Sequence, residues 1–334
     1  MTRYLVTGGL GFIGSAFIRR LSQPGREIVC VDSGTYASDT RRIHNVSGVK
    51  RIAVDVADSA LVECVLELRP DIIVHFAAET HVTRGEVKRE LFFRTNVQGT
   101  QRLLEAASFS PPQLVLHVST DEVYGPCFGK PFKEGEKLPG EGAATSAYAR
   151  SKALADDIAQ SHSDRLPVIV ARLTNCFGPW QHPEKAVPRW VTKALMKHRV
   201  PVWGNGRQIR DWLFVEDAVS GLELLVQRGI PGETYNLGPQ RPPKTNLEIA
   251  RLLAELANPD QPLVYLTEYD RPRHDQRYAV DSHKIRSLGW RPGDLDTQLA
   301  STVDWYRRNE QWWRSKTIQT EHLYPDSTEA EPHV

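Results

Sequence analysis

Short apolar runs alternate with amphipathic, helix-length segments through the first half of the chain. The runs are rich in Val and Ile and show little polar alternation: YLVTG, EIVCVD, RIAVD, IIVHFAA, LVLHVST and VIVARLTN. Strands that helices cover on both faces have this continuous apolar character, and they belong to parallel sheets built from βαβ units. The pattern predicts an α/β fold around a doubly wound parallel sheet.

The composition and periodicity of the chain change after about Thr174. Before that residue, helical periodicity fills the intervals between the runs, at 12–22, 59–68, 87–107 and 147–162. After it, Pro and Gly become frequent, and irregular stretches separate the helices expected at 184–198, 215–228, 246–257 and 295–314. We therefore predict a sheet domain to which some later segments return, a smaller mixed α/β C-terminal lobe and a polar, mobile tail. Their expected bounds are 1–174, 175–316 and 317–334.

Composition and charge exclude several classes of partner. The chain has 334 residues, 40% of them apolar and 25% charged, with a formal net charge of +1. These values are ordinary for a globular protein and argue against nucleic acid or a membrane surface as a partner. We find neither a run of about 20 apolar residues nor a signal peptide. The cysteines are scattered without a CxxC pair, so we expect free thiols, no metal site and a cytoplasmic protein. They are Cys30, Cys64, Cys127 and Cys176.

The segment TGGLGFIG follows the first strand and opens a helix. Gly8 permits a tight turn, Gly11 a close approach of the backbone to a pyrophosphate, and Gly14 close packing of helix on strand. Asp32 ends the second strand, where a carboxylate accepts a hydrogen bond from a ribose 2′-hydroxyl and repels a 2′-phosphate. A glycine-rich turn without a ligand is the plain alternative. The context favours a Rossmann-type sheet that binds NAD rather than NADP.

A tyrosine and a lysine stand four residues apart in SAYARSKALADD, at the start of a predicted helix. Tyr148 and Lys152 therefore share one helix face. A lysine cation lowers the pKa of a neighbouring phenol, so Tyr148 can accept a hydroxyl proton while a hydride leaves the same carbon. A YxxxK pair is common by chance, but the dinucleotide motif upstream strengthens it. Both sites are expected in the crevice outside the carboxyl ends of the strands.

Two adjacent acids, Asp121 and Glu122, follow a buried strand in HVSTDEVYGP. Neighbouring carboxylates repel each other, and this repulsion separates their pKa values. A reaction that needs one ionised and one protonated carboxyl group in the same pocket benefits from such a pair. The plain alternative is a solvated turn between strand and loop.

Together, these residues resemble the extended short-chain dehydrogenase/reductase family and, within it, the dTDP-glucose 4,6-dehydratases. The resemblance covers about residues 3–313. STDEVYG and RPRHDQRYAVD are specific to this branch, whereas TGGLGFIG is not. Further stretches that carry the resemblance are SGTYAS, HFAAETHVTR, TNVQGT, HPEKAVP, GNGRQIRDWLFVEDA, GETYNLG and VDWYRRNEQWW.

The resemblance implies an NAD-dependent lyase that acts on dTDP-glucose or a related nucleoside diphosphate hexose. Tyr148 would remove the proton of the sugar 4-hydroxyl as hydride passes to NAD, with Thr120 assisting at the 4-oxygen. Glu122 would then take the C5 proton while Asp121 protonates the departing 6-hydroxyl. Return of the hydride to C6 and of a proton to C5 gives the 4-keto-6-deoxy sugar.

The resemblance also implies the remaining contacts, with 175–316 as the nucleotide-sugar-binding lobe and a homodimer formed through 88–107 and 147–162. Two arginines suit the charge and geometry of a diphosphate. The implied cofactor-binding residues are Gly8, Gly11, Phe12, Ile13, Gly14, Asp32, Asp55, Val56, Ala77, Ala78, Tyr148 and Lys152. The implied substrate-binding residues are His81, Arg84, Asn175, Glu184, Lys185, Trp203, Arg210, Asn246, Arg271 and His274.

The chain departs from the family pattern near the expected hexose pocket. Thr83 stands in place of an aspartate, Gly85 in place of a serine, and Cys176 in place of an asparagine. Trp203 stands where the family usually has a tyrosine beside the base. The resemblance therefore defines the class of reaction more closely than it defines the sugar.

Two other functions stay open at this point. A UDP-sugar epimerase or decarboxylase of the same family would use Tyr148, Lys152 and NAD, but it has no need of both Asp121 and Glu122. The acid pair therefore favours dehydration. A non-catalytic, dinucleotide-binding regulator is the third possibility, and the presence of both the tyrosine and the lysine argues against it.

Overall fold

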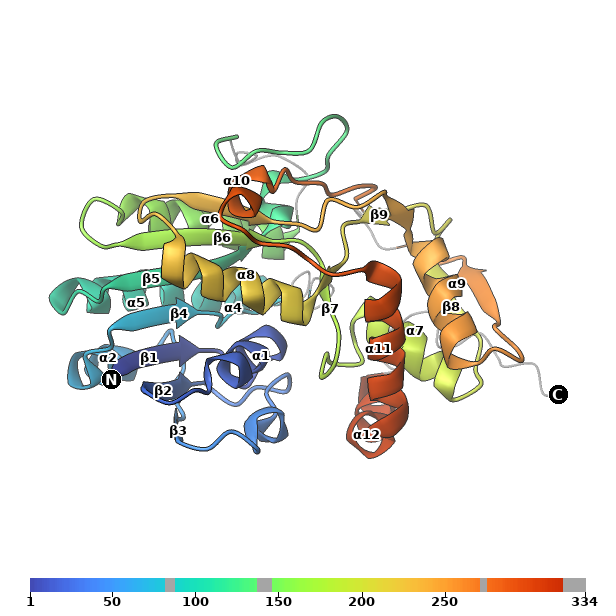
Figure 1. Cartoon of the computed structure of the whole chain (residues 1–334), viewed down its shortest axis with the longest axis horizontal. Coiled ribbons are helices and arrows are strands. Elements are labelled where there is room, and N and C mark those ends of the chain that lie inside the picture. Colours follow the sequence, from blue (N-terminus) through green and yellow to red (C-terminus); the bar gives the residue numbers. More distant parts are fainter. Residues whose placement is uncertain (82–87, 137–145, 271–274, 321–334) are drawn as a thin grey trace.

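A single parallel sheet organises the larger part of the molecule, shown as a computed structural model in Figure 1. The structure describes residues 1–81, 88–136, 146–270 and 275–320. Within these residues the sheet has seven strands in the order β11-β6-β5-β4-β1-β2-β3, and every neighbouring pair is parallel. The strands are β1 (Thr2–Thr7), β2 (Arg26–Val31), β3 (Val49–Ile52), β4 (Ile72–His75), β5 (Leu114–Thr120), β6 (Val168–Leu173) and β11 (Thr234–Leu237). The predicted doubly wound sheet is confirmed.

Helices cover both faces of this sheet. On one face, α1 (Phe12–Leu21) and α8 (Val215–Arg228) form a core with residues such as Val6 of β1. On the other face, α2 (Ala60–Leu68), α5 (Gly99–Phe109) and α6 (Ala147–Ser161) pack against residues such as Leu5. Because successive side chains of a strand point to opposite faces, both alternating sets must be apolar, and each strand reads as a continuous apolar run.

The helix predicted at 87–107 is interrupted by a turn of π-helix. Helix α4 (Arg89–Phe92) passes into η2 (Phe93–Gln98) before α5 begins. The wider turn contains the buried Asn96, whose amide donates hydrogen bonds to Ser151 Oγ of α6 and to the Glu79 carbonyl, at 2.9 and 3.0 Å. A regular hydrophobic period gives no sign of such a turn, so the sequence did not predict it.

A second core lies beyond the carboxyl ends of the strands, to the right of the sheet in Figure 1. Its helices are α7 (Ala186–Leu195), α9 (Asn246–Ala257), α11 (Leu295–Arg308) and α12 (Glu310–Thr320). Three short strand pairs accompany them: β7 (Cys176–Phe177) with β10 (Leu213–Phe214), β8 (Val200–Trp203) with β13 (Val264–Thr267), and β9 (Ile209–Arg210) with β12 (Lys244–Thr245). We call this part the small lobe.

The chain passes back and forth between the two bodies. After entering the small lobe it returns to the sheet with α8 and β11, and α10 (His283–Ser287) packs against β11. The helix predicted at 295–314 is two helices, because the chain breaks at Asn309. Helix α12 continues to Thr320, so the first four residues of the predicted tail, 317–320, are helical, with Thr317 and Thr320 buried.

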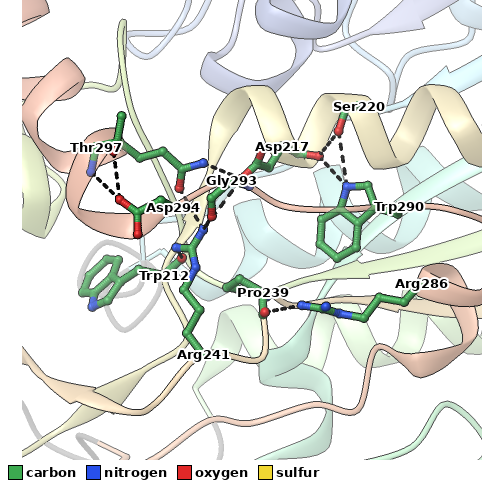
Figure 2. Close-up of polar contacts among 11 residues, drawn as sticks. Trp212, Asp217, Ser220, Pro239, Arg241, Arg286, Trp290, Gly293, Asp294 and Thr297 are labelled. Carbon is green, nitrogen blue, oxygen red and sulfur yellow. Dashed lines mark hydrogen bonds and ion pairs between the residues drawn. The ribbon is translucent and has the colours of Figure 1, made fainter.

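Arg241 joins the small lobe to the sheet domain (Figure 2). Its guanidinium donates to Gln298 Oε1 of α11 at 2.9 Å and lies 3.8 Å from the Asp217 carboxylate of α8. Asp217 in turn accepts hydrogen bonds from Gln298 Nε2 at 2.6 Å and from the Gly293 amide at 2.9 Å. The Trp290 indole donates to the Asp217 backbone carbonyl. The side chain and the backbone of Asp217 therefore both bind the segment 290–298. These contacts fix the small lobe relative to the carboxyl edge of the sheet.

Candidate active site

A cavity of about 500 Å³ lies between the carboxyl edge of the sheet and the small lobe. Its wall includes the ends of β2, β5 and β6 and the start of α6. Asp121 lies behind the wall, almost fully buried. Arg84, Arg271 and His274 lie outside the described residues, as do Thr83 and Gly85. The predicted site residues on the wall are Gly8, Gly11, Phe12, Ile13, Gly14, Asp32, Asp55, Val56, Ala77, Ala78, His81, Thr120, Glu122, Tyr148, Lys152, Asn175, Glu184, Lys185, Trp203, Arg210 and Asn246.

The turn after β1 forms a cradle that only glycine permits. Gly8 has φ +66°, and a Cβ there would lie 2.7 Å from the Ala77 amide nitrogen. A Cβ on Gly14 would lie 2.4 Å from the Gly8 carbonyl oxygen. Helix α1 begins directly afterwards, so its first amides and the positive end of its dipole meet the cavity. This geometry suits the pyrophosphate of a dinucleotide.

Asp32 and Asp55 both reach the cavity, with different partners. The Asp32 carboxylate accepts from the Leu10 amide (2.9 Å), the Gly34 amide (2.9 Å) and Ser38 Oγ (2.6 Å). A carboxylate has about four acceptor sites, so one is left for a ligand hydroxyl. Asp55 is ion-paired with Arg94 at 2.6 Å. Its carboxylate is therefore partly engaged by the protein itself.

Tyr148 and Lys152 lie on one face of α6, as predicted. Lys152 is buried and donates from Nζ to the Val118 carbonyl at 2.9 Å. Burial lowers the pKa of Lys152 to about 8. The pKa of Tyr148 is raised, first by burial and then by the Glu122 charge, while a hydrogen bond from Thr120 lowers it. The sequence predicted that Lys152 lowers the pKa of Tyr148, whereas in the protein alone burial is the largest influence on that pKa and raises it.

The two adjacent acids occupy different environments on η3 (Asp121–Tyr124), which follows β5. Thr120 Oγ1 donates to Asp121 Oδ1 at 3.3 Å and accepts from the Glu122 amide at 3.3 Å. Asp121 Oδ2 is buried and has no hydrogen-bond partner among the described residues. Burial, then the charges of Glu122 and Asp211, raise the pKa of Asp121 well above its ordinary value. These surroundings favour the protonated form of Asp121, which lies behind the wall, whereas Glu122 lies on the cavity wall.

The far end of the cavity carries polar groups that the described protein leaves unsatisfied. Arg210 stacks over the Tyr278 ring, with its guanidinium carbon 4.6 Å from the ring centre, and donates to the Asp275 carbonyl at 2.8 Å. Asn175 Oδ1 and Asn246 Oδ1 are buried there without a hydrogen-bond partner among the described residues. Buried acceptors of this kind cost free energy unless a ligand or water satisfies them. The arrangement suits a polar, anionic ligand.

Glu184 and Lys185 connect the small lobe to loops of the sheet domain across the cavity. Glu184 Oε1 accepts from the Tyr36 hydroxyl at 3.0 Å, and Glu184 Oε2 lies 3.8 Å from His81 Nε2. Lys185 Nζ donates to the Thr80 carbonyl at 3.0 Å. These contacts hold the two walls of the cavity together.

Trp203 and Cys176, two of the departures from the family pattern, lie on the cavity wall. The Trp203 ring meets Tyr269 edge-on, with their centres 5.3 Å apart. Cys176 Sγ contacts the Thr174 carbonyl at 3.4 Å. Burial, and then Asp121, raise the pKa of Cys176, so its thiol stays protonated.

Several wall residues were not predicted from the sequence. Tyr278, Trp212 and Tyr36 line or close the cavity, and Asp211 acts on the pKa of Asp121 from outside the wall. Tyr278 and Tyr36 fall in quoted family stretches, but no spacing or periodicity marks them. Within the described residues, no group of His, Cys, Asp and Glu could hold a metal ion. No described helix has the length and apolar character needed to cross a membrane.

Comparison with known sequences gives matches over nearly the whole chain. The model of the NAD dependent epimerase/dehydratase family matches residues 4–238. A dTDP-glucose 4,6-dehydratase of Neisseria meningitidis serogroup B is 40% identical, covering 94% of this chain and 96% of the relative. One from Neisseria gonorrhoeae is 42% identical, covering 92% of this chain and 96% of the relative.

Comparison with solved structures also finds similarity to a dTDP-glucose 4,6-dehydratase. DesIV, a dTDP-glucose 4,6-dehydratase of Streptomyces venezuelae crystallised with NAD bound, has a TM-score of 0.86 and 39% identity. The alignment covers 94% of this chain and 100% of DesIV. A UDP-glucose 4-epimerase of Thermotoga maritima has a TM-score of 0.85 at 24% identity, covering 92% of this chain and 100% of that protein. The second match reflects a shared fold.

Proposed function

The chain belongs to the NAD dependent epimerase/dehydratase family and, within it, to the dTDP-glucose 4,6-dehydratases, and from that premise we propose how its residues perform the reaction. The enzyme is an NAD-dependent hydro-lyase that converts dTDP-glucose to the 4-keto-6-deoxy sugar. The observation that carries the mechanism is the pair formed by a buried Asp121, whose pKa is raised, and Glu122 on the cavity wall near Tyr148.

NAD fits the end of the cavity nearest β1 and β2. The glycine cradle and the start of α1 would hold the pyrophosphate, and the remaining acceptor site of Asp32 would bind a ribose hydroxyl. Asp55, Val56, Ala77 and Ala78 would line the adenosine and nicotinamide positions. When bound, NAD supplies the redox chemistry, taking a hydride from C4 of the hexose and returning it to C6, so the sugar undergoes no net oxidation.

Tyr148 would accept the proton of the 4-hydroxyl as C4 is oxidised. Thr120 supports this role because its hydroxyl hydrogen-bonds to the phenol oxygen and lowers the pKa of Tyr148. Lys152 would add a positive charge next to the same oxygen. A 4-ketone formed in this way acidifies the proton on C5.

The acid pair would then eliminate water across C5 and C6. Glu122, on the cavity wall, would accept the C5 proton, while Asp121 would donate its proton to the departing 6-hydroxyl. Glu122 would return a proton to C5 as the hydride reaches C6. Asp121 is suited to its part because its raised pKa favours the protonated form. An epimerase has no leaving hydroxyl to protonate, so the same observation favours dehydration over epimerisation.

The nucleotide and sugar would occupy the small-lobe end of the cavity. Arg210 would bind the diphosphate, and Asn175 and Asn246 offer unsatisfied acceptors to sugar or base. The remaining contacts would come from His81, Glu184, Lys185 and Trp203, with Arg84, Arg271 and His274 as further candidates. The small thiol of Cys176 would border the hexose.

A direct assay tests this function. Incubation of the full protein with NAD and dTDP-glucose should produce the alkali-induced absorbance of a 4-keto-6-deoxy sugar, and Tyr148→Phe should abolish it. UDP-, GDP- and CDP-glucose in parallel should react more slowly. Conversion to a C4 epimer without this absorbance would contradict the proposal.

The proposal also includes the oligomeric state and the cellular location of the protein. A homodimer through α5 and α6 is supported by their common position on one face of the sheet and by exposed Phe109 and Leu154. Analytical ultracentrifugation that finds only monomer at micromolar concentration would contradict it.

A cytoplasmic location is supported by free thiols at Cys30, Cys64, Cys127 and Cys176. Recovery of the protein from an extracytoplasmic fraction of its source cells would contradict that.

A further inference from the structure

Helix α6 carries a third ionisable residue, Asp156, on the same face as Tyr148 and Lys152. Asp156 is four residues beyond Lys152, so all three lie on one helix face. Lys152 has 3% of its surface exposed and Asp156 has 0%. Asp156 does not line the cavity. A fully buried carboxylate so close to a buried lysine needs an explanation, because burial of either charge alone is costly.

Asp156 is held by one strand of the sheet and lies near a second. Arg172 of β6 donates from Nε to Asp156 Oδ2 at 2.8 Å. His117 Nε2 of β5 lies 3.4 Å from Oδ1, and Oδ1 has no hydrogen-bond partner among the described residues. Arg172 also donates to the Tyr124 hydroxyl at 2.6 Å. Burial raises the pKa of Asp156, but His117 and the Arg172 charge outweigh it and lower the pKa below its ordinary value. Asp156 is therefore ionised and fixed in place.

The titratable groups facing Lys152 come from every element packed against it. Burial, followed by Lys152 and other neighbouring charges, lowers the pKa of His117 on β5 to about 4, and burial also lowers that of His75 on β4, so both are neutral at pH 7. Glu122 of η3, Cys176 of β7 and Tyr148 lie on the cavity wall, and Asp121 lies behind it. The pKa values of Asp121, Cys176 and Tyr148 are all raised, which favours the neutral form of each. Arg172 adds a second buried cation.

We propose, on the basis of the function above, that Asp156 is a positioning residue whose carboxylate, held by Arg172, keeps the buried Lys152 protonated beside Tyr148. Burial by itself would drive Lys152 toward its neutral form, and Asp156 is the group among the described residues that opposes this. Since the pKa of Lys152 is only about 8, little margin remains above a working pH near 7.

Removal of the carboxylate has a defined consequence. In Asp156→Asn, Arg172 and Lys152 would be two buried cations with no counter-charge between them. Arg172 keeps its proton, so Lys152 would lose its own at lower pH. Arg172→Gln has the opposite effect, because it leaves the Asp156 charge to act on Lys152 alone. A purely structural ion pair would respond in the same way to loss of either partner.

The test compares the basic limb of the kcat/KM pH profile in the NAD-loaded enzyme and these variants. Asp156→Asn should move that limb down by at least one pH unit, with KM for dTDP-glucose within twofold of the unaltered enzyme. Arg172→Gln should move the basic limb to higher pH, and the double variant should return the limb toward its position in the unaltered enzyme. Asp156→Glu, which keeps the carboxylate, should leave the limb close to that position. Asp157→Asn, at the exposed neighbouring position, should leave it unchanged.

A second readout does not depend on turnover. Competitive labelling of the full chain with acetic anhydride, read by mass spectrometry, gives the titration of Lys152 relative to exposed Lys197. The Lys152 midpoint should fall in Asp156→Asn and rise in Arg172→Gln. Shifts of the same sign in both, or no shift in either, would overturn the proposal. If Asp156→Asn does not fold, Arg172→Gln and the double variant still decide it. Shifts as expected in a protein without dehydratase activity would overturn the proposed function and leave the role of Asp156 standing.

Discussion

Asp121, beside Tyr148, and Asp156, one helical turn beyond Lys152, are buried to nearly the same extent, with 2% and 0% of their surfaces exposed. Asp156 has Arg172 at 2.8 Å and His117 at 3.4 Å, and its pKa is lowered despite burial. Each of the two has one carboxyl oxygen without a hydrogen-bond partner among the described residues, but Asp121 has two acidic neighbours instead of an arginine, and its pKa is raised. Burial alone therefore does not decide the charge of a carboxyl group. The partners that the fold provides decide it.

The difference has a functional meaning. In the proposed mechanism, Asp121 gives a proton to the departing hydroxyl, and its raised pKa suits that role. In the further proposal, Asp156 supplies a negative charge to the buried Lys152. Substitutions at the two positions should separate these roles.

The largest effect is expected from Asp121→Asn, which removes the proton donor while keeping the shape of the side chain. Turnover of dTDP-glucose should fall by about 10²- to 10⁴-fold, the usual contribution of a general acid. The unfolding temperature at pH 7 should not fall, because a neutral group replaces a neutral group. Steady-state kinetics and calorimetry measure both. An Asp121→Asn enzyme with unchanged turnover would remove Asp121 from the mechanism.

Asp156→Asn, unlike Asp121→Asn, should lower the stability of the protein. Loss of one partner from a buried ion pair costs about 3–5 kcal/mol, because it leaves Arg172 without its counter-charge. Asp157→Asn, at the exposed neighbouring position, should change the free energy of unfolding by less than about 0.5 kcal/mol. Urea titration of the three proteins makes the comparison. Equal stability of both variants would mean that the Arg172 pair contributes nothing to the fold.

The smallest expected effect is in the pH dependence of stability. The folded pKa of Asp121 is raised, so its contribution is complete below an unfolded value of about 3.9 and declines as the pH rises toward the folded value. The unfolding temperature of Asp121→Asn relative to the unaltered protein should therefore increase from pH 4.5 to pH 7. Asp156 is ionised in both states above about pH 5, so the deficit of Asp156→Asn should stay constant from pH 5 to pH 8. Thermal scans across this range check both trends, and parallel curves for the two variants would contradict the assigned charge states.

The dinucleotide end of the cavity was predictable because its residues follow short-range rules. Gly8, Gly14 and Asp32 belong to one βαβ unit, where the close approach of backbone to backbone requires glycine at fixed spacing. The other end gathers Asn175 from the segment after β6, Arg210 from β9 and Asn246 from the start of α9, and each was assigned by resemblance. Tyr278 and Asp211 were not predicted, because no local spacing or periodicity marks either residue.

The sequence by itself determined the parallel sheet, the dinucleotide turn, the YxxxK face of α6 and the acid pair, because hydrophobic period, glycine spacing and helical spacing are local properties of the chain. Tertiary structure decided the π-turn that directs Asn96 to α6, the raised pKa of Tyr148, and the opposite charge states of Asp121 and Asp156. Those properties depend on burial and on partners far apart in the chain, such as Arg172, and no local pattern records either of them.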